Sequence, residues 1–185
     1  MGSERDGSFD SHVVLVTGGT RGIGQVIAQG FLSAGAEVVV CARHAPDDPI
    51  ESDGHQATFI ETDVRDIEAI DRLISAIIDQ FGRLDVLVNN AGGSPFAYAA
   101  GASPRFSEAV IGLNLIAPLN LCQRANTVMQ GQDAGGVIVN IASVSGVRAS
   151  PGTAAYGAAK AGLINLGQTL AVEWAPKVRV NSVTA

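Results

Sequence analysis

The sequence predicts an α/β fold, in which a doubly wound parallel sheet forms a single domain. Short apolar runs of strand length alternate about five times with longer stretches of helical periodicity. The runs are continuously apolar, as expected for strands covered on both faces. The 185 residues are 46% hydrophobic and 16% charged, which suits one packed core and excludes extensive disorder.

The first half of the chain is expected to hold three strands and two helices. The first helix follows a glycine-rich loop and has Ile23, Ile27 and Phe31 at helical spacing, while the second places Ile70, Leu73 and further apolar residues on one face. The expected strands cover residues 13–16, 37–41 and 57–60. Residues 43–56 contain two prolines and four acidic residues, so we expect a surface loop that replaces or shortens a crossover helix.

The second half is expected to contain strands at 86–88, 137–141 and 178–183, with long helices at 104–129 and 153–174. Strands separated by helices imply right-handed parallel crossovers. Ligands of such sheets bind at the carboxyl ends of the strands, here in the loops after residues 16, 41, 88 and 141. We assign residues 12–185 to this domain and residues 1–11 to a polar N-terminal segment.

Composition argues against several classes of partner. The net charge of −6 does not favour nucleic acid or an anionic membrane, and no apolar stretch has membrane-spanning length. Cys41 and Cys122 lie inside apolar runs and are interpreted as inert buried thiols, so we expect a cytoplasmic location. The three histidines lack metal-ligand spacing, and we predict no metal site. Neither a G-x-S-x-G nor a G-x-x-x-x-G-K-[ST] motif is present.

The loop after the first strand carries the strongest local motif. Residues 17–24 read Thr-Gly-Gly-Thr-Arg-Gly-Ile-Gly, with Gly18, Gly22 and Gly24 in a G-x-x-x-G-x-G spacing that differs from G-x-G-x-x-G. Glycines let the backbone approach a pyrophosphate closely, while the free N–H groups at the helix start attract the anion. The alternative is a glycine-rich turn that binds nothing.

Further motifs follow in register with this loop. Asp63-Val64, then Asn89-Asn90-Ala91-Gly92, and then Asn114, Ser143, Tyr156 and Lys160 occur in that order. Together they resemble the short-chain dehydrogenase/reductase family through nearly the whole chain. The resemblance implies a Rossmann-like fold and a catalytic set of Asn114, Ser143, Tyr156 and Lys160. It also implies a nicotinamide cofactor bound by Gly18, Thr20, Arg21, Gly22, Ile23, Gly24, Arg43, Asp63, Val64, Asn90, Ala91, Gly92, Tyr156 and Lys160.

The cofactor is predicted to be NADP(H). Enzymes that prefer NAD(H) place a carboxylate at the end of the second strand, where this chain has Ala42. Arg43 follows, and Arg21 lies in the glycine loop. Two guanidiniums suit a 2′-phosphate, because arginine bonds phosphate oxygens bidentately. The alternative is that both arginines are solvated surface charges.

The predicted chemistry is hydride transfer with Tyr156 as acid and base. Tyr156 and Lys160 are four residues apart on an expected helix, so they share a face. A free tyrosine holds its proton up to about pH 10, and a nearby ammonium favours phenolate. Ser143 would hold the carbonyl oxygen of the substrate. In the family, Asn114 holds a water that links Lys160 to solvent.

The pattern departs from the family at the C-terminus. Residues 181–185 read Asn-Ser-Val-Thr-Ala, and the family's substrate-covering loop and seventh strand do not follow. We therefore expect this sequence to be part of a longer product. A small-molecule ketone or its alcohol is the expected substrate, with acyl thioesters, sugars and steroids all open. The resemblance implies a homo-oligomer, a tetramer or dimer, formed through the two long helices.

Two other functions compete with this one. A cofactor-binding sensor or scaffold would keep the nucleotide fold without turnover, but it would not need Asn114, Ser143, Tyr156 and Lys160. An epimerase or dehydratase of nucleotide sugars would carry a G-x-x-G-x-x-G loop, which the spacing of Gly18, Gly22 and Gly24 does not match.

Overall fold

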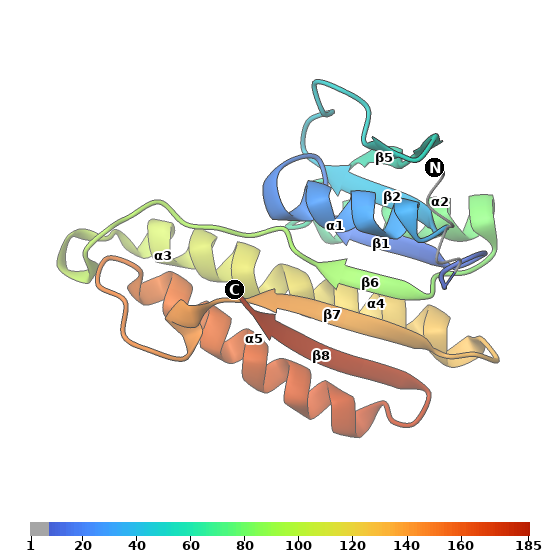
Figure 1. The fold of residues 1–185 in the computed structure, drawn as a ribbon. Coiled ribbons are helices and arrows are strands. Elements are labelled where there is room, and N and C mark those ends of the chain that lie inside the picture. Colours follow the sequence, from blue (N-terminus) through green and yellow to red (C-terminus); the bar gives the residue numbers. More distant parts are fainter. Residues whose placement is uncertain (1–7) are drawn as a thin grey trace.

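A computed structural model describes residues 8–185 of the chain, so most of the polar segment expected over residues 1–11 lies outside the described residues. Its centre is a sheet of six parallel strands in the order β5-β2-β1-β6-β7-β8 (Figure 1). The order reverses between β1 and β6, which confirms the doubly wound, single-domain fold. The strands are β1 (Val13–Thr17), β2 (Glu37–Ala42), β5 (Thr58–Glu61), β6 (Val86–Asn89), β7 (Gly136–Ala142) and β8 (Val178–Thr184).

Two apolar clusters, one on each face of the sheet, form the core. On one face, helices α2 (Ile67–Phe81), α4 (Ala117–Gly131) and α5 (Ala154–Glu173) pack against alternate strand residues such as Leu15 and Ile138. On the other face, α1 (Gly22–Ser33) packs against the residues between them, such as Val14 and Val40. Strands β1, β2 and β6 are buried on both faces because helices cover both, which explains their unbroken apolar sequence.

The helix expected over residues 104–129 is divided in the structure. It consists of α3 (Pro104–Ile111), a π-helical turn (Gly112–Ile116) and α4. Pro118 has no N–H to donate to the carbonyl of Asn114, so regular α-helical bonding cannot continue through this turn. The π turn places Asn114 in the interior.

The segment 43–56 contains no helix, as expected, but it ends in a small hairpin. Strands β3 (Glu51–Ser52) and β4 (His55–Gln56) pair antiparallel across Asp53 and Gly54, both of which have positive φ. An Asp-Gly pair at positive φ is typical of a two-residue hairpin turn, so the Asp53-Gly54 pair could have predicted this hairpin from the sequence. The remaining short helices are 3-10 turns at Ala99–Gly101 and Val144–Gly146.

Across the part of the chain that the structure describes, none of the helices combines the length and apolar character needed to cross a membrane.

Candidate active site

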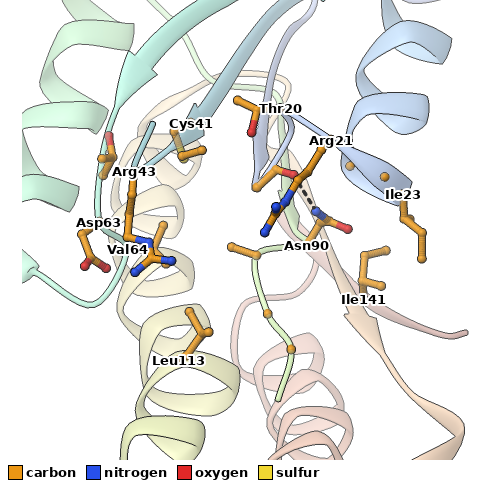
Figure 2. Close-up of a pocket in the computed structure, with 18 of the residues that line it drawn as sticks. Thr20, Arg21, Ile23, Cys41, Arg43, Asp63, Val64, Asn90, Leu113 and Ile141 are labelled. Atoms are coloured by element: carbon orange, nitrogen blue, oxygen red, sulfur yellow. Dashed lines mark hydrogen bonds between the residues drawn. The ribbon is translucent and has the colours of Figure 1, made fainter. Parts of the chain in front are cut away.

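A cavity of about 920 Å³ opens at the carboxyl ends of the strands, where the topology predicts a ligand site (Figure 2). The loops after β1, β2, β5, β6 and β7 form its walls, together with Tyr156 and Lys160 from α5. The residues expected to bind a cofactor all line it: Gly18, Thr20, Arg21, Gly22, Ile23, Gly24, Arg43, Asp63, Val64, Asn90, Ala91, Gly92, Tyr156 and Lys160. Ser143 lines it too, whereas Asn114 lies behind the wall.

The glycine loop forms a cradle whose shape depends on missing side chains. Gly18 and Gly22 have φ of +63° and +57°, which favour glycine. A Cβ on Gly24 would lie 2.3 Å from the Gly18 carbonyl oxygen and 2.4 Å from Asn90 Nδ2, so only glycine fits there. Helix α1 begins at Gly22 without a side-chain cap or an acidic residue in its first turn. Its free N–H groups therefore suit the pyrophosphate of a dinucleotide.

Thr17 and Asn90 fix the cradle to the neighbouring strand. The amides of Asn90 and Ala91 both donate to Thr17 Oγ1 at 3.0 Å, and Asn90 Nδ2 donates to the carbonyls of Thr17 at 2.9 Å and Gly18 at 3.2 Å. On the other side, the Gly18 amide donates to the carbonyl of Cys41 at 2.8 Å. Sequence reasoning gave Thr17 no role. Its position as the first residue of the Thr-Gly-Gly-Thr-Arg-Gly-Ile-Gly motif was the signal that could have found it.

Charged side chains gather at the end of the cavity formed by β2 and β5. Arg43 and Arg65 line this end together with Asp63 and Asp47, while Arg21 lines the cavity from the glycine loop. The Arg65 guanidinium donates hydrogen bonds to both carboxylate oxygens of Asp63. These bonds, with a smaller contribution from the charge of Arg43, lower the pKa of Asp63 below its ordinary value. Arg65 was not among the expected residues, although the Asp-x-Arg spacing of residues 63–65 could have indicated the pair.

Tyr156, Lys160 and Ser143 occupy the opposite part of the cavity. Lys160 Nζ donates to the carbonyl of Ile141 at 2.7 Å and lies 5.7 Å from the centroid of the Tyr156 ring. Burial lowers the pKa of Lys160 to about 8, so its ammonium is still present at neutral pH. Ser143 Oγ accepts from the Ser145 amide at 3.3 Å, which leaves its O–H free to donate.

Asn114 supports the loop after β6. Its Nδ2 donates to the carbonyls of Gly93 at 2.9 Å and Val110 at 2.8 Å, while its Oδ1 accepts from the Gly93 amide at 2.9 Å. Both side-chain donors are therefore engaged. A water expected at Asn114 would have to use the second lone pair of Oδ1 or the backbone carbonyl.

Within residues 8–185, no group of three or more histidine, cysteine, aspartate or glutamate side chains is arranged to hold a metal ion. Cys41 and Cys122 are free and buried, and burial raises the pKa of each thiol to about 12. Both are therefore neutral thiols at physiological pH.

Sequence comparisons identify relatives across the described residues. The family model for short chain dehydrogenases matches residues 12–185. A 3-oxoacyl-[acyl-carrier-protein] reductase from Synechocystis sp. is 38% identical over 183 residues, which cover 95% of this chain and 74% of that protein. A 3beta-hydroxysteroid dehydrogenase from Mediterraneibacter gnavus is 36% identical over 183 residues, covering 92% of this chain and 63% of that protein.

Solved structures share the fold. A putative short-chain alcohol dehydrogenase from Sinorhizobium meliloti superposes with a TM-score of 0.88 at 34% identity, covering 96% of this chain and 73% of that one. The aldohexose dehydrogenase of Thermoplasma acidophilum superposes with a TM-score of 0.86 at 30% identity, covering 95% of this chain and 66% of that one.

Proposed function

Because this chain belongs to the short-chain dehydrogenase family, whose members are oxidoreductases that use a nicotinamide cofactor, we propose that it transfers a hydride between NADP(H) and a carbonyl or secondary alcohol. One observation carries the proposal. A single cavity joins the glycine cradle to Tyr156, Lys160 and Ser143. A sensor without turnover would need only the cradle.

The nicotinamide, when bound, supplies or accepts the hydride. Side chains of the protein transfer the proton and orient the substrate oxygen. In reduction, the Tyr156 hydroxyl transfers its proton to the carbonyl oxygen as the carbon gains hydride, and in oxidation Tyr156 takes the proton back. The Lys160 ammonium lies 5.7 Å from the centroid of the Tyr156 ring, so a positive charge stands beside the group that exchanges the proton. Ser143 donates a hydrogen bond that orients the substrate oxygen.

Charge at the β2 and β5 end of the cavity supports NADP(H) over NAD(H). Ala42 stands where NAD-preferring enzymes carry a carboxylate, so the side chain at this position does not repel a 2′-phosphate. Arg21 and Arg43 line the same cavity from different loops, as Figure 2 shows. Guanidiniums bond phosphate oxygens bidentately, which gives the phosphorylated cofactor a specific advantage.

An exposed aromatic pair in the loop after β6, beyond the residues that line the cavity, supports a ketone or alcohol with an apolar body. The rings of Phe96 and Tyr98 pack edge to face, 5.1 Å apart, and both are largely exposed. The Ala97 amide donates to the carbonyl of Gly152 at 3.0 Å, which holds this loop next to the segment after Ser143. Relatives named for 3-oxoacyl and 3beta-hydroxysteroid substrates are compatible with such a surface. Turnover assays with a panel of acyl thioesters, steroids and sugars would identify the substrate class that the protein accepts.

We also propose a cytoplasmic homo-oligomer, either a tetramer or a dimer. The two free, buried thiols suit a reducing compartment. On the outer surface of the long helical region, Val172 is 80% exposed and Ile116 is 45% exposed, which suits a contact between copies. Light scattering of the purified protein measures the assembly, and a monomer at micromolar concentration would contradict it.

Calorimetric titration tests the cofactor assignment. NADPH should bind at least tenfold more tightly than NADH, and Arg43→Ala should remove most of that difference. Arg72→Ala, on the exposed face of α2, serves as a control of equal charge change outside the cavity. Equal affinity for the two cofactors would refute the NADP(H) preference.

Turnover tests the chemical assignment. Tyr156→Phe should reduce kcat by at least a hundredfold while NADPH affinity stays within a few fold, because only the transferable proton is lost. A Tyr156→Phe protein with near-normal kcat would rule out Tyr156 as the acid and base.

A further inference from the structure

The loop between β6 and α3, residues 93–103, is hydrogen-bonded to the rest of the molecule at two points. At its start, the amide and the carbonyl of Gly93 both bond the side chain of Asn114, each at 2.9 Å. Four residues later, the Ala97 amide donates to the carbonyl of Gly152 at 3.0 Å, in the segment that leads into α5. Figure 1 shows both segments at the same end of α5. The loop therefore extends from Asn114 to the start of the helix that carries the proposed acid and base.

The Phe96 ring adds a close contact at the second of these points. Gly152 is buried, and its φ of +78° favours glycine. A Cβ at position 152 would also lie within 2.6 Å of three carbons on one edge of the Phe96 ring. The ring thus fills the space that a side chain at position 152 would occupy, although Phe96 as a whole is 66% exposed. Both the backbone conformation and the neighbouring ring therefore require glycine here.

Few other contacts restrain this end of the loop. None of residues 93–103 is buried, and a hollow of about 70 Å³ lies between the loop, α3 and the start of α5. Apart from Phe106, the hollow is lined by alanine, glycine, serine and threonine. A segment with few buried apolar contacts opens at low free energy. The ring of Phe96 on Gly152 and the bond from Ala97 are therefore the main restraints.

The position of this loop affects the substrate side of the cavity more than the cofactor side. Gly92 and Gly93, at its start, line the cavity, and Gly152 precedes Tyr156 by only four residues. The glycine cradle belongs instead to β1 and α1. A loop that lifted from Gly152 would displace the cavity wall beside Tyr156 and leave the cradle in place.

We propose that Phe96 is a positioning residue, which packs on Gly152 and so holds the loop of residues 93–103 where it forms the substrate side of the site. Phe96 acts through the loop and does not touch the reacting atoms. The kinetic consequence rests on the proposed oxidoreductase function, whereas the contact itself is measured without turnover.

Hydrogen exchange of the Ala97 amide in the cofactor-free protein, followed by mass spectrometry of peptides from the loop, tests the contact. Phe96→Ala should speed this exchange by about tenfold or more, because one hydrogen bond remains as the restraint. Its Tm should change by less than about 3 °C, because the ring is largely exposed. Phe96→Leu, which keeps an apolar side chain on Gly152, should stay within about threefold of the wild type.

Gly152→Ala should speed the exchange as Phe96→Ala does, because its Cβ displaces the ring. The double variant Phe96→Ala/Gly152→Ala should exchange no faster than Phe96→Ala, since both changes remove the same contact. Gly54→Ala is the matched control for backbone strain. Gly54 has a φ of +79°, but a Cβ there would meet nothing within 4 Å, so the exchange of Ala97 should not change.

Turnover supplies a second readout. With the best substrate among the acyl thioesters, steroids and sugars, Phe96→Ala should raise KM by about fivefold or more. Its kcat and its affinity for NADPH should change by less than about twofold, because the proton-transferring side chains and the cradle stay in place. A general loss of folded structure would lower all of these together.

The proposal is overturned if Phe96→Ala leaves the exchange of Ala97 unchanged, if Gly152→Ala behaves like Gly54→Ala, or if KM does not rise. A double variant whose effect equals the sum of the two single effects would also contradict it. A wild-type protein that turns over no substrate of any class would refute the proposed function instead. The exchange of Ala97 would still decide whether Phe96 holds the loop.

Discussion

The Lys160 ammonium is buried where the proposed chemistry needs it, and this burial opposes folding. Lys160 is 3% exposed, and its pKa falls from 10.5 to about 8. Between these values the unfolded chain holds more protons than the folded one, so the free energy of unfolding rises with pH across this window. Below the window, the full penalty of about 3 kcal/mol is present, offset by the bond to Ile141.

Lys160→Met should therefore stabilise the cofactor-free protein at neutral pH by about 2 kcal/mol while abolishing turnover. Its advantage over the wild type should shrink as the pH rises from about 8 to about 10.5, because only the wild type loses a buried charge. Urea denaturation at several pH values measures this. If the free energies of unfolding of the two proteins changed in parallel with pH, burial of the Lys160 ammonium would not destabilise the folded state.

Gly92 separates Asn114 from Lys160. A Cβ at Gly92 would lie 2.7 Å from Asn114 Oδ1 and 3.3 Å from Lys160 Nζ, both closer than ordinary contact. Gly92→Ala should displace one of these side chains, reduce kcat by at least tenfold, and destabilise the protein by about 1–3 kcal/mol. At Gly101 a Cβ would meet nothing within 4 Å, so Gly101→Ala is the control and should leave both measurements unchanged.

At the scale of single elements, α2 depends on its N-terminal cap. Asp66 Oδ1 accepts from the amides of Glu68 at 2.9 Å and Ala69 at 3.3 Å. Asp66→Ala should lower stability by about 1 kcal/mol, or roughly 2–4 °C in Tm for a chain of this size. The same substitution at Asp79, near the C-terminal end of α2, removes an unfavourable interaction with the helix dipole and should have no effect or stabilise slightly. Equal losses at both positions in thermal melts would argue against capping.

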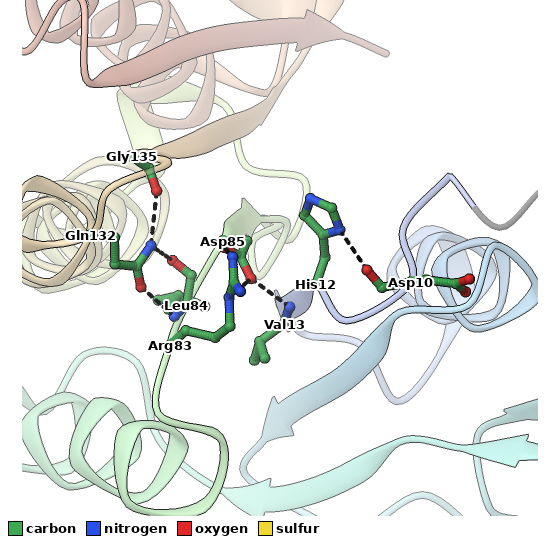
Figure 3. A network of polar contacts seen from close by, with 8 residues as sticks. All are labelled: Asp10, His12, Val13, Arg83, Leu84, Asp85, Gln132 and Gly135. Carbon is green, nitrogen blue, oxygen red and sulfur yellow. Dashed lines mark hydrogen bonds and ion pairs between the residues drawn. The ribbon is translucent and has the colours of Figure 1, made fainter.

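At the scale of the whole molecule, a polar network holds the amino ends of the strands, opposite the cavity (Figure 3). The Asp85 carboxylate accepts a hydrogen bond from the Val13 amide at 2.8 Å and two more from Nε and Nη2 of the Arg83 guanidinium. Gln132 bonds both the amide and the carbonyl of Leu84, as well as the carbonyl of Gly135. These contacts join β1, β6 and the start of β7, which fixes the register from which the loops of the cavity emerge.

Asp85→Ala should destabilise the protein by about 3 kcal/mol, because it leaves the buried Val13 amide without an acceptor and the Arg83 guanidinium without its partner. Asp71→Ala, which breaks the exposed pair with Arg124 between α2 and α4, should cost less than about 1 kcal/mol. Guanidinium denaturation compares the two. If the two losses were similar, the network would have no special part in holding the sheet.

The sequence by itself determined the sheet, because each buried strand must be apolar whatever its neighbours are. The runs around Leu15, Val39 and Leu87 therefore predicted three of the central strands. It also determined the glycine cradle, since positive φ at Gly18 and the close approach at Gly24 restrict the residue type locally.

Only the tertiary structure decided which polar side chains meet. Thr17 contacts Asn90 across 73 positions, and Val13 contacts Asp85 across 72, so neither pairing leaves a periodic trace in the sequence. The π turn that buries Asn114, and the assembly of Arg43, Asp63 and Arg65 on one wall, likewise required the folded chain. Apolar burial follows from the type of each residue, whereas a hydrogen bond or an ion pair depends on the relative position of two residues, and that position exists only once the strands have paired.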